Sequence, residues 1–459
     1  MYLKQLPLFK NLNPYSGEID QNNRWIKVAE LVPWREIEGL YLRYFHPGKL
    51  GVIKNSRLIV GLMLGQMIEE KSDREIVAYF HENPYFQYFC GCDHFVVKLE
   101  RSIIHHSLLS KRRSRLGDSF MKAFEGEVLQ LLQKKGVLKG KKLILDATVF
   151  PSKITYPNDV KLLNTVREWG CATLLKLKQG IDPSQKIRTY RKTARKVFLR
   201  FQKIRRKTSA FIRKTRNSLL RFTKRNLDQL ETLIGQADSR MSQAMSEGSA
   251  VPFLSPSHLN SIKAKWEVAK QIVAQQGQLA KTRGRRVADR IVSFHQPQVR
   301  PIVRGKEGKS VEFGPKAHVA LVDGYAILDQ CQYDNFHEGI RLPESLKQHH
   351  ERFGTKPERL LADQIYATHA NRTLLQEQGI EHAFKRMGRP PTLQKNGRNT
   401  EKITFKKNQG QRNAIEATFG HLKERFNLRH IVLKVKDGAH IQIRLGLISR
   451  NLLRASSLA

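Results

Sequence analysis

One segment near the middle of the chain is strongly basic and contains no acid. Residues 186–226 hold 17 lysines and arginines and no aspartate or glutamate. Apolar or small residues recur there every three or four positions, which predicts one long helix with a single apolar seam. The seam consists of Val197, Phe201, Ile204, Thr208, Phe211, Thr215, Leu219 and Phe222. Such a helix must pack its seam against other helices and turn its cations outward, where they need a polyanion.

The whole chain shares this bias. Its 459 residues carry 82 lysines and arginines against 41 aspartates and glutamates, a formal net charge of +41. Nucleic acid is the polyanion that fits this charge, although a basic coiled coil without nucleic acid is an alternative. A membrane surface is disfavoured because the termini lack apolar faces and lipidation signals. The candidates for contact with DNA phosphates are Lys192, Arg195, Arg205, Arg206 and Arg213.

Other features of the sequence argue against a membrane-spanning, secreted, disulfide-rich or zinc-binding protein. The longest apolar run, residues 58–68, is too short to span a bilayer. The N-terminal residues lack the apolar core of a signal peptide, so we expect a cytoplasmic protein. Four cysteines are too few and too scattered for a disulfide framework. Cys90, Cys92 and His94 lie close in sequence, but no second ligand pair accompanies them, so buried thiols are favoured over a zinc site.

The N-terminal part reads mostly as helix. One helix should end just before Ser72, and the next should begin there, because Ser72 and Glu75 form a capping box. It should end before Asn83-Pro84. Two short helices joined tightly suit either a helix-turn-helix that binds DNA or an ordinary helical bundle, and the basic run at 111–117 adds to the first. We expect residues 1–125 to form a helical domain for DNA binding or oligomerisation.

Strand patterns frame the basic segment. KKLILDATVF, residues 141–150, is a short apolar run after a glycine turn. Strand character returns from about residue 288 in RIVSFH, SVEFGPKAHVALV, YAILDQCQY and then ERLLADQIY. These patterns predict an α/β core interrupted after its first strand. The predicted divisions are 126–158 for the first part of the core, 159–286 for a basic helical insertion, 287–430 for the remaining core and 431–459 for a C-terminal helix or tail.

Three acidic residues stand where metal chemistry could use them. Asp146 lies in or at the end of the first strand, Asp363 ends a later strand, and Glu416 lies on a helix after it. Parallel neighbouring strands could bring the three together. Phosphodiester cleavage uses metal ions held by a few carboxylates, and Mg²⁺ prefers such oxygen ligands. Each residue alone is better explained as a helix cap or surface carboxylate, but their joint placement favours a metal site.

The helix of Glu416 carries a further pattern. At 100° per residue, Arg412, Glu416 and Lys423 project within about 40° of one another. One carboxylate and two cations on one stripe suit phosphate chemistry. The ordinary alternative is a solvated helix face with a salt bridge one turn apart.

Together these segments resemble the DDE transposases of bacterial insertion sequences. Arg412, Glu416 and Lys423 match the Y-(2)-R-(3)-E-(6)-K signature of that family, with Gln409 at the tyrosine position. LILDAT resembles the family's first-aspartate strand, and LLADQIYATHANR resembles its second, where Tyr366 follows the aspartate by three residues. Residues 25–95 are similar to the N-terminal helical domain of one subgroup.

The resemblance implies an RNase H-like α/β catalytic core, a mixed sheet with flanking helices, joined to an N-terminal all-α domain and interrupted by the long basic insertion. It implies two Mg²⁺ ions, replaceable by Mn²⁺, held by Asp146, Asp363 and Glu416. These ions would activate water to nick the element's end, and then the freed 3′ hydroxyl to attack target DNA. Arg412 and Lys423 would hold phosphates beside the metals.

The implied partners are double-stranded DNA, at transposon ends and at the target, and a second copy of the chain in a paired-end homodimer. The expected location is the prokaryotic cytoplasm, in association with the nucleoid. Two other hypotheses stay open. One is a non-catalytic repressor or architectural protein derived from a transposase, and the other is a different RNase H-like nuclease.

Overall fold

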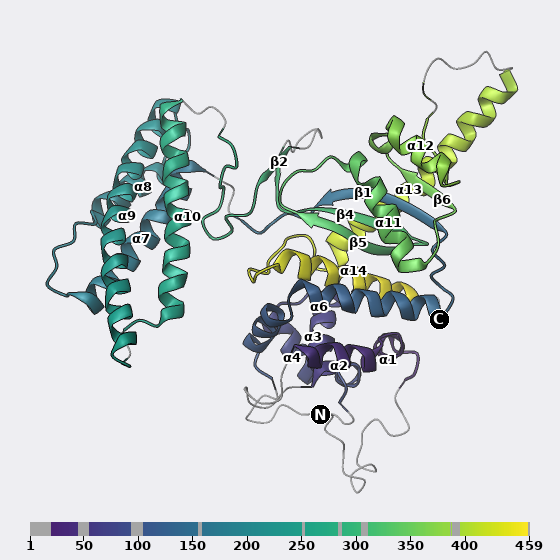
Figure 1. The fold of residues 1–459 in the computed structure, drawn as a ribbon, viewed down its shortest axis with the longest axis horizontal. Helices are drawn as coiled ribbons and strands as arrows, with labels where there is room; N and C mark the ends of the chain where they lie inside the picture. The colour runs from purple at the N-terminus through teal and green to yellow at the C-terminus, as the bar shows by residue number, and fades with distance from the viewer. Residues whose placement is uncertain are drawn as a thin grey trace, which may run out of the picture. The chain divides into compact units, whose positions relative to one another are not determined.

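The computed structural model describes residues 20–44, 55–92, 104–154, 158–249, 253–282, 287–303, 311–385, 387 and 395–457 (Figure 1). The chain forms two compact units. The first combines residues 1–153 with 314–459, and the second is 154–313. The second unit is therefore longer at both ends than the predicted insertion, and residues 287–313 belong to it.

A mixed sheet forms the centre of the first unit. Among the described residues it has five strands in the order β5-β4-β1-β6-β7. The central β1 (Lys142–Val149) pairs antiparallel with β4 (Lys316–Val322) and parallel with β6 (Arg359–Ala362). The edges are β5 (Tyr325–Gln332) and the two-residue β7 (Glu381–His382). The predicted mixed sheet is confirmed.

Helices cover both faces of this sheet. On one face, helix α13 (Lys395–Arg425) packs Ile415 and Leu422 into a cluster with Ile144 of β1. On the other, α11 (Leu342–Phe353) packs against Leu143 and Leu145. The alternation of strand side chains explains the division, because even-numbered positions of β1 face α13 and odd-numbered positions face α11. The short helix α12 (His369–Glu377) connects β6 to β7.

The N-terminal helices form a bundle in the same unit. Their bounds are α1 (Arg24–Glu30), α2 (Trp34–Arg43), α3 (Ser56–Ile68), α4 (Asp73–Glu82) and α5 (Pro84–Phe89). The predicted capping box is confirmed: Ser72 N–H donates to Glu75 Oε2 at 2.8 Å, and Glu75 N–H donates to Ser72 Oγ at 3.4 Å. Nearly every residue of α3 is buried. This helix is therefore the centre of a bundle.

The basic run at 111–117 has a structural use that the sequence did not reveal. It lies in α6 (Ser107–Lys134), where Arg113 is buried. The Arg113 guanidinium donates to Gln66 Oε1 at 3.1 Å and pairs with Asp73 at the start of α4. A buried cation held this way cannot contact DNA, so the run gives less support to DNA reading than expected.

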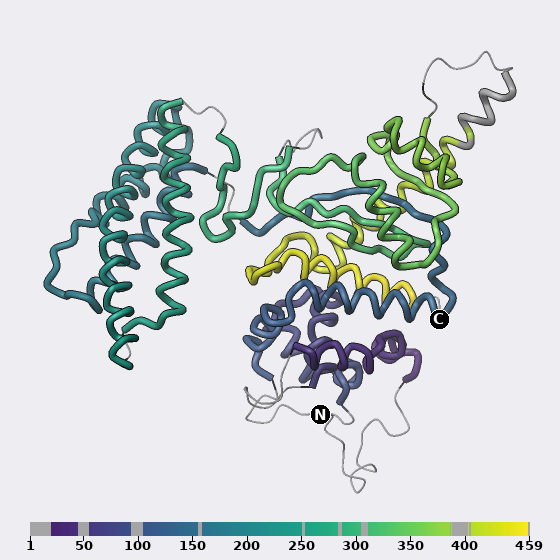
Figure 2. Tube along the Cα trace, in the orientation of Figure 1, coloured from purple at the N-terminus to yellow at the C-terminus, as the bar shows by residue number. Residues whose placement is uncertain are grey.

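The C-terminal helix is a central element of the first unit. Helix α14 (Gly438–Ser456) is buried along most of its length and packs against α6, α3 and β5. Figure 2 traces it in yellow beside the blue α6. Arg444 donates from Nε to Asp118 at 2.9 Å and pairs with Glu125, both on α6. Glu125 in turn accepts the N–H of Leu328 on β5 at 3.2 Å. These contacts join α14, α6 and the sheet.

The second unit is a helical bundle with a small hairpin. Its helices are α7 (Asp159–Ile181), α8 (Arg191–Lys203), α9 (Ser209–Ser246) and α10 (Pro256–Lys281). The hairpin pairs β2 (Pro301–Val303) with β3 (Val311–Phe313). Helix α9 continues to Ser246, and α10 begins at Pro256.

The prediction of one continuous helix through the seam is wrong. Helix α8 ends at Lys203, and α9 begins after Thr208, whose Oγ1 accepts the Phe211 N–H at 3.3 Å. The two helices fold back on each other, and the rings of Phe201 and Phe211 stack with centroids 6.1 Å apart. The apolar residues of the seam pack between α8 and α9 and against α7. These contacts stabilise the turn between the two helices.

The prediction of a strand at RIVSFH is also wrong. Residues 287–300 form no strand in the described structure. The Ile291 N–H donates to Oε1 of Gln275 at 2.9 Å, and Phe294 packs on Trp169 with ring centroids 5.2 Å apart. The apolar residues of this segment pack against the helical bundle. The Ile291 N–H bonds to a side chain, where a strand residue would bond to a neighbouring strand.

Candidate active site

The two predicted aspartates lie on neighbouring parallel strands. Asp146 is within β1, and Asp363 directly follows the last residue of β6. Leu145 is the register partner of Ala362, so the next position on each strand is an aspartate. Adjacent strands are roughly 5 Å apart, which places the two backbones side by side. Asp363 is exposed, and its Oδ1 accepts the Gln364 N–H at 2.5 Å, whereas the side chain of Asp146 is only 16% exposed.

Helix α13 runs along the face of β1 that carries Asp146. Lys142 Nζ donates to Gln411 Oε1 at 2.9 Å. Further along, Lys423 Nζ donates to Thr148 Oγ1 at 3.1 Å. Lys142, Asp146 and Thr148 share one face of β1, since alternate strand residues do so. Lys423 of the predicted stripe therefore faces the strand that carries the first aspartate.

Arg412 is the cation between the two acidic positions. Its Nη2 donates to Glu416 Oε1 at 2.8 Å, and its Nη1 lies 3.9 Å from Oδ2 of Asp146. Its Nε donates to Oε1 of Gln409 at 3.1 Å. Gln409 thus has a use at the position where the signature has tyrosine. The side chain of Glu416 is 56% exposed, so solvent reaches this carboxylate where it contacts Arg412.

The electrostatics of Asp146 differ from those of an ordinary surface aspartate. Burial raises the pKa of Asp146 to about 6. The Ala147 N–H and Arg412 lower this pKa, while the nearby carboxyl groups of Glu338 and Glu416 raise it. A cation placed near such a buried carboxyl group stabilises its ionised form and lowers its pKa. Among the described residues, no three His, Cys, Asp or Glu side chains are grouped closely enough to hold one ion together.

Glu338 is a neighbour of the site that sequence reasoning missed. It begins the short 3-10 turn η2 (Glu338–Arg341), and its Oε1 lies 2.8 Å from Nζ of Lys316 on β4. Its carboxyl group raises the pKa of Asp146, as that of Glu416 does. No motif marked it, because its proximity to β1 depends on the tertiary fold.

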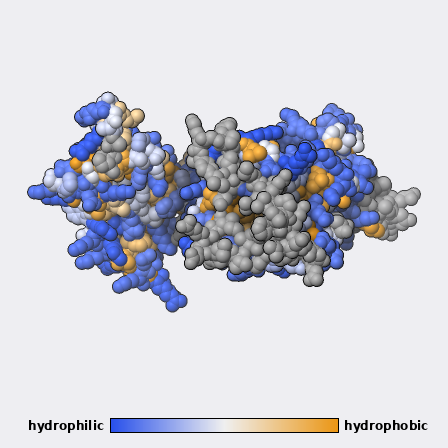
Figure 3. Space-filling model, turned by 90° about the horizontal axis from the view of Figure 1, so that it is seen from below, coloured by the Kyte–Doolittle hydropathy of each residue, from blue (hydrophilic) through white to orange (hydrophobic). Residues whose placement is uncertain are grey.

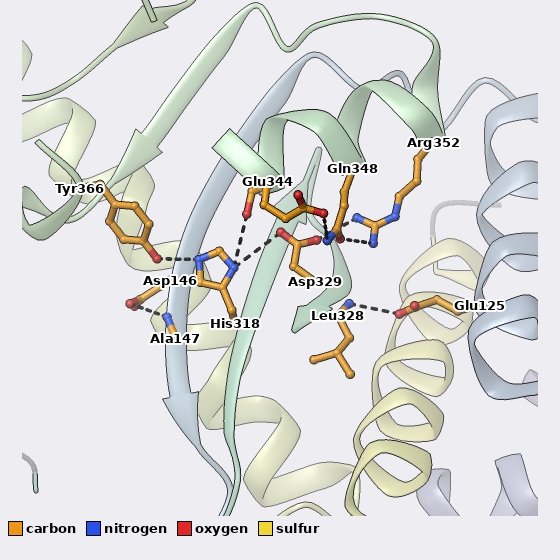
Figure 4. Close-up of polar contacts among 11 residues, drawn as sticks. Glu125, Asp146, Ala147, His318, Leu328, Asp329, Glu344, Gln348, Arg352 and Tyr366 are labelled. Atoms are coloured by element: carbon orange, nitrogen blue, oxygen red, sulfur yellow. Dashed lines mark hydrogen bonds and ion pairs between the residues drawn. The ribbon is translucent and has the colours of Figure 1, made fainter. Parts of the chain in front are cut away.

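A buried polar chain lies beside the aspartates and was also missed (Figure 4). His318 Nε2 and the Tyr366 hydroxyl are 2.7 Å apart, and His318 Nδ1 faces Asp329 Oδ2 at 3.6 Å. Arg352 Nη1 donates to Asp329 Oδ1 at 2.8 Å. Because a carboxylate only accepts, a neutral His318 carries its proton on Nδ1, and Nε2 accepts from Tyr366. The available signal was a histidine inside the apolar strand KAHVALV.

The charged groups in this row of buried polar residues compensate one another. Burial raises the pKa of Asp329, but the nearby His318 imidazole and the Arg352 guanidinium outweigh burial and hold this pKa below its usual range. Burial raises the pKa of Tyr366, and neighbouring carboxyl groups raise it further. Tyr366 is therefore a neutral phenol fixed beside the active-site strands.

The predicted phosphate contacts of the basic segment lie on the second unit. Lys192 and Arg195 are exposed on α8, Arg205 and Arg206 are exposed in the turn after it, and Arg213 is exposed on α9. Most of the face of this unit seen in Figure 3 is hydrophilic. By contrast, Arg216 of the same segment is buried.

Two remaining expectations concern metal and membrane. Cys90 is buried and Cys92 is partly buried, both as free thiols, while His94 lies outside the described residues. No helix in the described part of the chain is long and apolar enough to cross a membrane.

Comparisons with known proteins connect this geometry to a family. Residues 14–115 match the family model of a Transposase domain, and residues 360–453 match that of a Transposase DDE domain. The second range contains Asp363, Arg412, Glu416 and Lys423. An uncharacterized protein, ORF8 in the nfe locus of Rhizobium meliloti, is 27% identical over 148 residues, which are 31% of this chain and 69% of that protein. No solved structure matches the chain. The resemblance seen in the sequence is confirmed: the chain is similar to a Transposase domain over residues 14–115 and to a Transposase DDE domain over residues 360–453.

Proposed function

We propose that this protein cleaves DNA at the ends of an insertion sequence with the help of divalent metal, and joins the freed 3′ hydroxyl to target DNA. One observation carries the proposal. Asp146 and Asp363 occupy adjacent register positions, and α13 presents Arg412 and Lys423 along the same face of β1. The order of strands and the covering helices support an RNase H-like core.

The proposed ligands have the chemistry that a hard divalent cation prefers. The proposed ligands Asp146, Asp363 and Glu416 supply only carboxylate oxygens, which Mg²⁺ prefers and Mn²⁺ accepts. Burial raises the pKa of Asp146 to about 6, and a bound cation would favour its ionised form. The Arg412 side chain lies between Asp146 and Glu416. Its movement toward a DNA phosphate would free both carboxylates for metal. When bound, Mg²⁺ would lower the pKa of the attacking water and stabilise the leaving oxygen.

The chain's own residues would position the DNA. Arg412, oriented by Gln409, would hold a phosphate through two N–H groups. Lys423, held at Thr148, would add a point charge further along α13. The exposed cations Lys192, Arg195, Arg205, Arg206 and Arg213 would contact the DNA backbone. A homodimer would bring two element ends together.

The test is cleavage of a labelled duplex that contains the element's end. We expect Asp146→Asn, Asp363→Asn and Glu416→Gln each to abolish Mg²⁺-dependent nicking and strand transfer, with DNA affinity close to that of the wild type. Glu377→Gln, which removes an exposed carboxylate on α12, is the matched control and should cleave normally. Wild-type cleavage by any of the three variants would overturn the assignment of the triad.

One observation favours a second candidate function. Arg412 pairs with Glu416 and lies near Asp146 without any metal, as in a salt-bridged helix face. A non-catalytic DNA-binding protein would keep this arrangement. Specific binding to the element's end, with no cleavage by the wild type in Mg²⁺ or Mn²⁺, would support this alternative.

A further inference from the structure

One partly buried arginine of the first unit contacts only neutral groups. Arg450 of α14 donates from Nη1 to the Gly324 carbonyl at 3.0 Å and from Nη2 to Oγ1 of Thr418 at 3.1 Å. A longer contact of 3.4 Å joins Nη1 to Oδ1 of Asn451. The Nε atom is buried without a hydrogen-bond partner, and no described carboxylate forms an ion pair with Arg450. The described part of the chain therefore leaves this guanidinium charge uncompensated.

Other buried or partly buried arginines of the same unit are compensated. Three of them pair with carboxylates: Arg113 with Asp73, Arg352 with Asp329, and Arg444 with Asp118 and Glu125. Withdrawing a guanidinium from water without such a partner is costly. Burial and the nearby Arg454 accordingly lower the pKa of Arg450 to about 10. An anionic ligand would supply the missing compensation.

Three other basic side chains lie near Arg450. Arg454 is exposed one turn further along α14, with its guanidinium carbon 5.6 Å from the ring centroid of Tyr325. A Cβ atom on Gly324 would lie 2.6 Å from Nη2 of Arg454, so both arginines approach the turn between β4 and β5. On α13, burial lowers the pKa of His421, and Arg450 and Arg425 lower it further. His421, Arg425, Arg450 and Arg454 are called the Arg450 cluster below.

The nearby acidic residues do not neutralise this cluster. Asp323 precedes Gly324 in the turn, and its carboxylate accepts four backbone N–H groups of residues 139–142, at 2.7–3.3 Å. It forms no ion pair with Arg450 or Arg454 in the described structure. Glu424 is exposed on α13 and forms no ion pair with any described cation. The cluster thus presents positive charge to solvent.

The Arg450 cluster lies on the opposite side of α13 from the stripe of Arg412, Glu416 and Lys423. At 100° per residue, His421 and Arg425 project roughly 140° to 180° away from Arg412. Lys423 contacts Thr148 of β1, whereas Arg450 reaches α13 from α14. A ligand at the cluster therefore binds separately from a phosphate held by Arg412.

We propose that the Arg450 cluster binds a phosphate of the DNA backbone, at a site separate from the one that cleaves DNA. The inference rests on the proposed function for the identity of the polyanion. The planar fork of an arginine suits phosphate oxygens, and Nη2 of Arg450 has a second N–H that bonds to no described residue. The net charge of +41 favours a polyanion. The phosphate belongs to the element's end or to the target duplex, and the experiment separates the two.

The first experiment measures DNA affinity of the full chain by fluorescence anisotropy in EDTA, from low to moderate salt. Arg454→Gln removes an exposed guanidinium that makes no hydrogen bond to the described residues, so the fold should be kept. We expect about fivefold weaker binding, the effect of one hydrogen bond, and a slope of log K against log salt reduced by about 0.9. Lys347→Gln, which removes an exposed cation of α11, is the control and should change neither.

Substitutions of Arg450 separate its charge from its structural contacts. Arg450→Lys and Arg450→Gln both lose the bonds to Gly324 and Thr418, but only glutamine removes the charge. We expect the lysine variant to keep most of the salt slope and the glutamine variant to lower it by about 0.9. Wild-type slopes in both Arg454→Gln and Arg450→Gln would overturn the site and leave Arg450 as a clamp between α14 and the β4–β5 turn. If Arg450→Gln does not fold, the slope of Arg454→Gln alone decides.

Modification by phenylglyoxal, followed by mass spectrometry, locates the contact directly. Saturating DNA should protect Arg454 in the wild-type protein, and an equally reactive Arg454 with and without DNA would overturn the site. Weaker binding of the end duplex by Arg454→Gln assigns the phosphate to the element's end. Normal end binding, with weaker capture of a second labelled duplex, assigns it to the target.

The same data distinguish failure of this site from failure of the proposed function. If the wild type never cleaves DNA in Mg²⁺ or Mn²⁺ but DNA protects Arg454, the proposed function fails and the phosphate site stands. If the wild type cleaves the end duplex while Arg454 stays reactive, the proposed function stands and the phosphate site is wrong.

Discussion

Arg412 places its Nη1 atom 3.9 Å from Oδ2 of Asp146, linking helix α13 to the central strand of the sheet. This separation exceeds that of a hydrogen bond, so the guanidinium compensates the recessed carboxylate only in part. The same guanidinium holds Glu416 at 2.8 Å. One cation therefore bridges two residues that we propose as metal ligands, and its position decides whether they are free.

The pH dependence of the free energy of unfolding should show the cost of burying the ionised Asp146 carboxylate. Burial raises its pKa from 3.8 to about 6, so the folded protein binds this proton more tightly than the unfolded chain does. The stability that the proton contributes is full below pH 3.8 and is lost as the pH rises through about 6. Asp146→Asn should then raise the free energy of unfolding by on the order of 2 kcal/mol near pH 8 and change it little near pH 4.

Urea unfolding in EDTA at the two pH values measures this difference. Glu377→Gln serves as the control, since its carboxylate is exposed on α12. An Asn variant that is no more stable than the wild type near pH 8 would show that Asp146 is well compensated in the metal-free protein.

Gln409 should matter for catalysis through Arg412. Its Oε1 accepts the Nε–H of Arg412 at 3.1 Å, which orients the guanidinium toward Asp146 and Glu416. We expect Gln409→Ala to lower kcat for end cleavage about tenfold, the usual size of the effect when a hydrogen bond to a charged group is removed, with KM for DNA nearly unchanged. Single-turnover cleavage measures both parameters. In the Arg412→Ala background the same substitution should have no further effect, and an equal second decrease would mean that Gln409 acts independently.

The exposed cations of the second unit should control salt dependence. Removing Arg205, Arg206 and Arg213 together should lower DNA affinity, and should reduce the slope of log K against log salt by about 0.9 for each DNA phosphate that the variant no longer neutralises. Fluorescence anisotropy from low to moderate salt gives the slope. Lys347→Ala/Lys356→Ala removes exposed charge at α11 and the loop after it, and should leave the slope nearly unchanged. Equal slopes for all three proteins would exclude this surface from DNA binding.

Local patterns predicted several elements correctly. The capping box of Ser72 and Glu75 starts α4, and the apolar run around Asp146 forms β1. The spacing of Arg412, Glu416 and Lys423 put them on one helix, α13. These features depend on hydrogen bonds and periodicities within short segments, which the sequence displays directly.

Features that depend on tertiary packing were missed. The seam spacing continues through Ile204 and Thr208, so periodicity alone could not reveal that α8 and α9 fold back there. Glu338 and His318 reach the site through strand pairing and a turn that bring distant segments together. A single sequence gives no measure of such proximity.

Metal binding tests the central claim most directly. Calorimetric titration of the wild-type protein with Mn²⁺ should show saturable binding, which Asp146→Asn should remove and Glu377→Gln should retain. Equal binding by the wild type and Asp146→Asn, or no binding by the wild type with or without end DNA, would contradict a metal-dependent active site at Asp146.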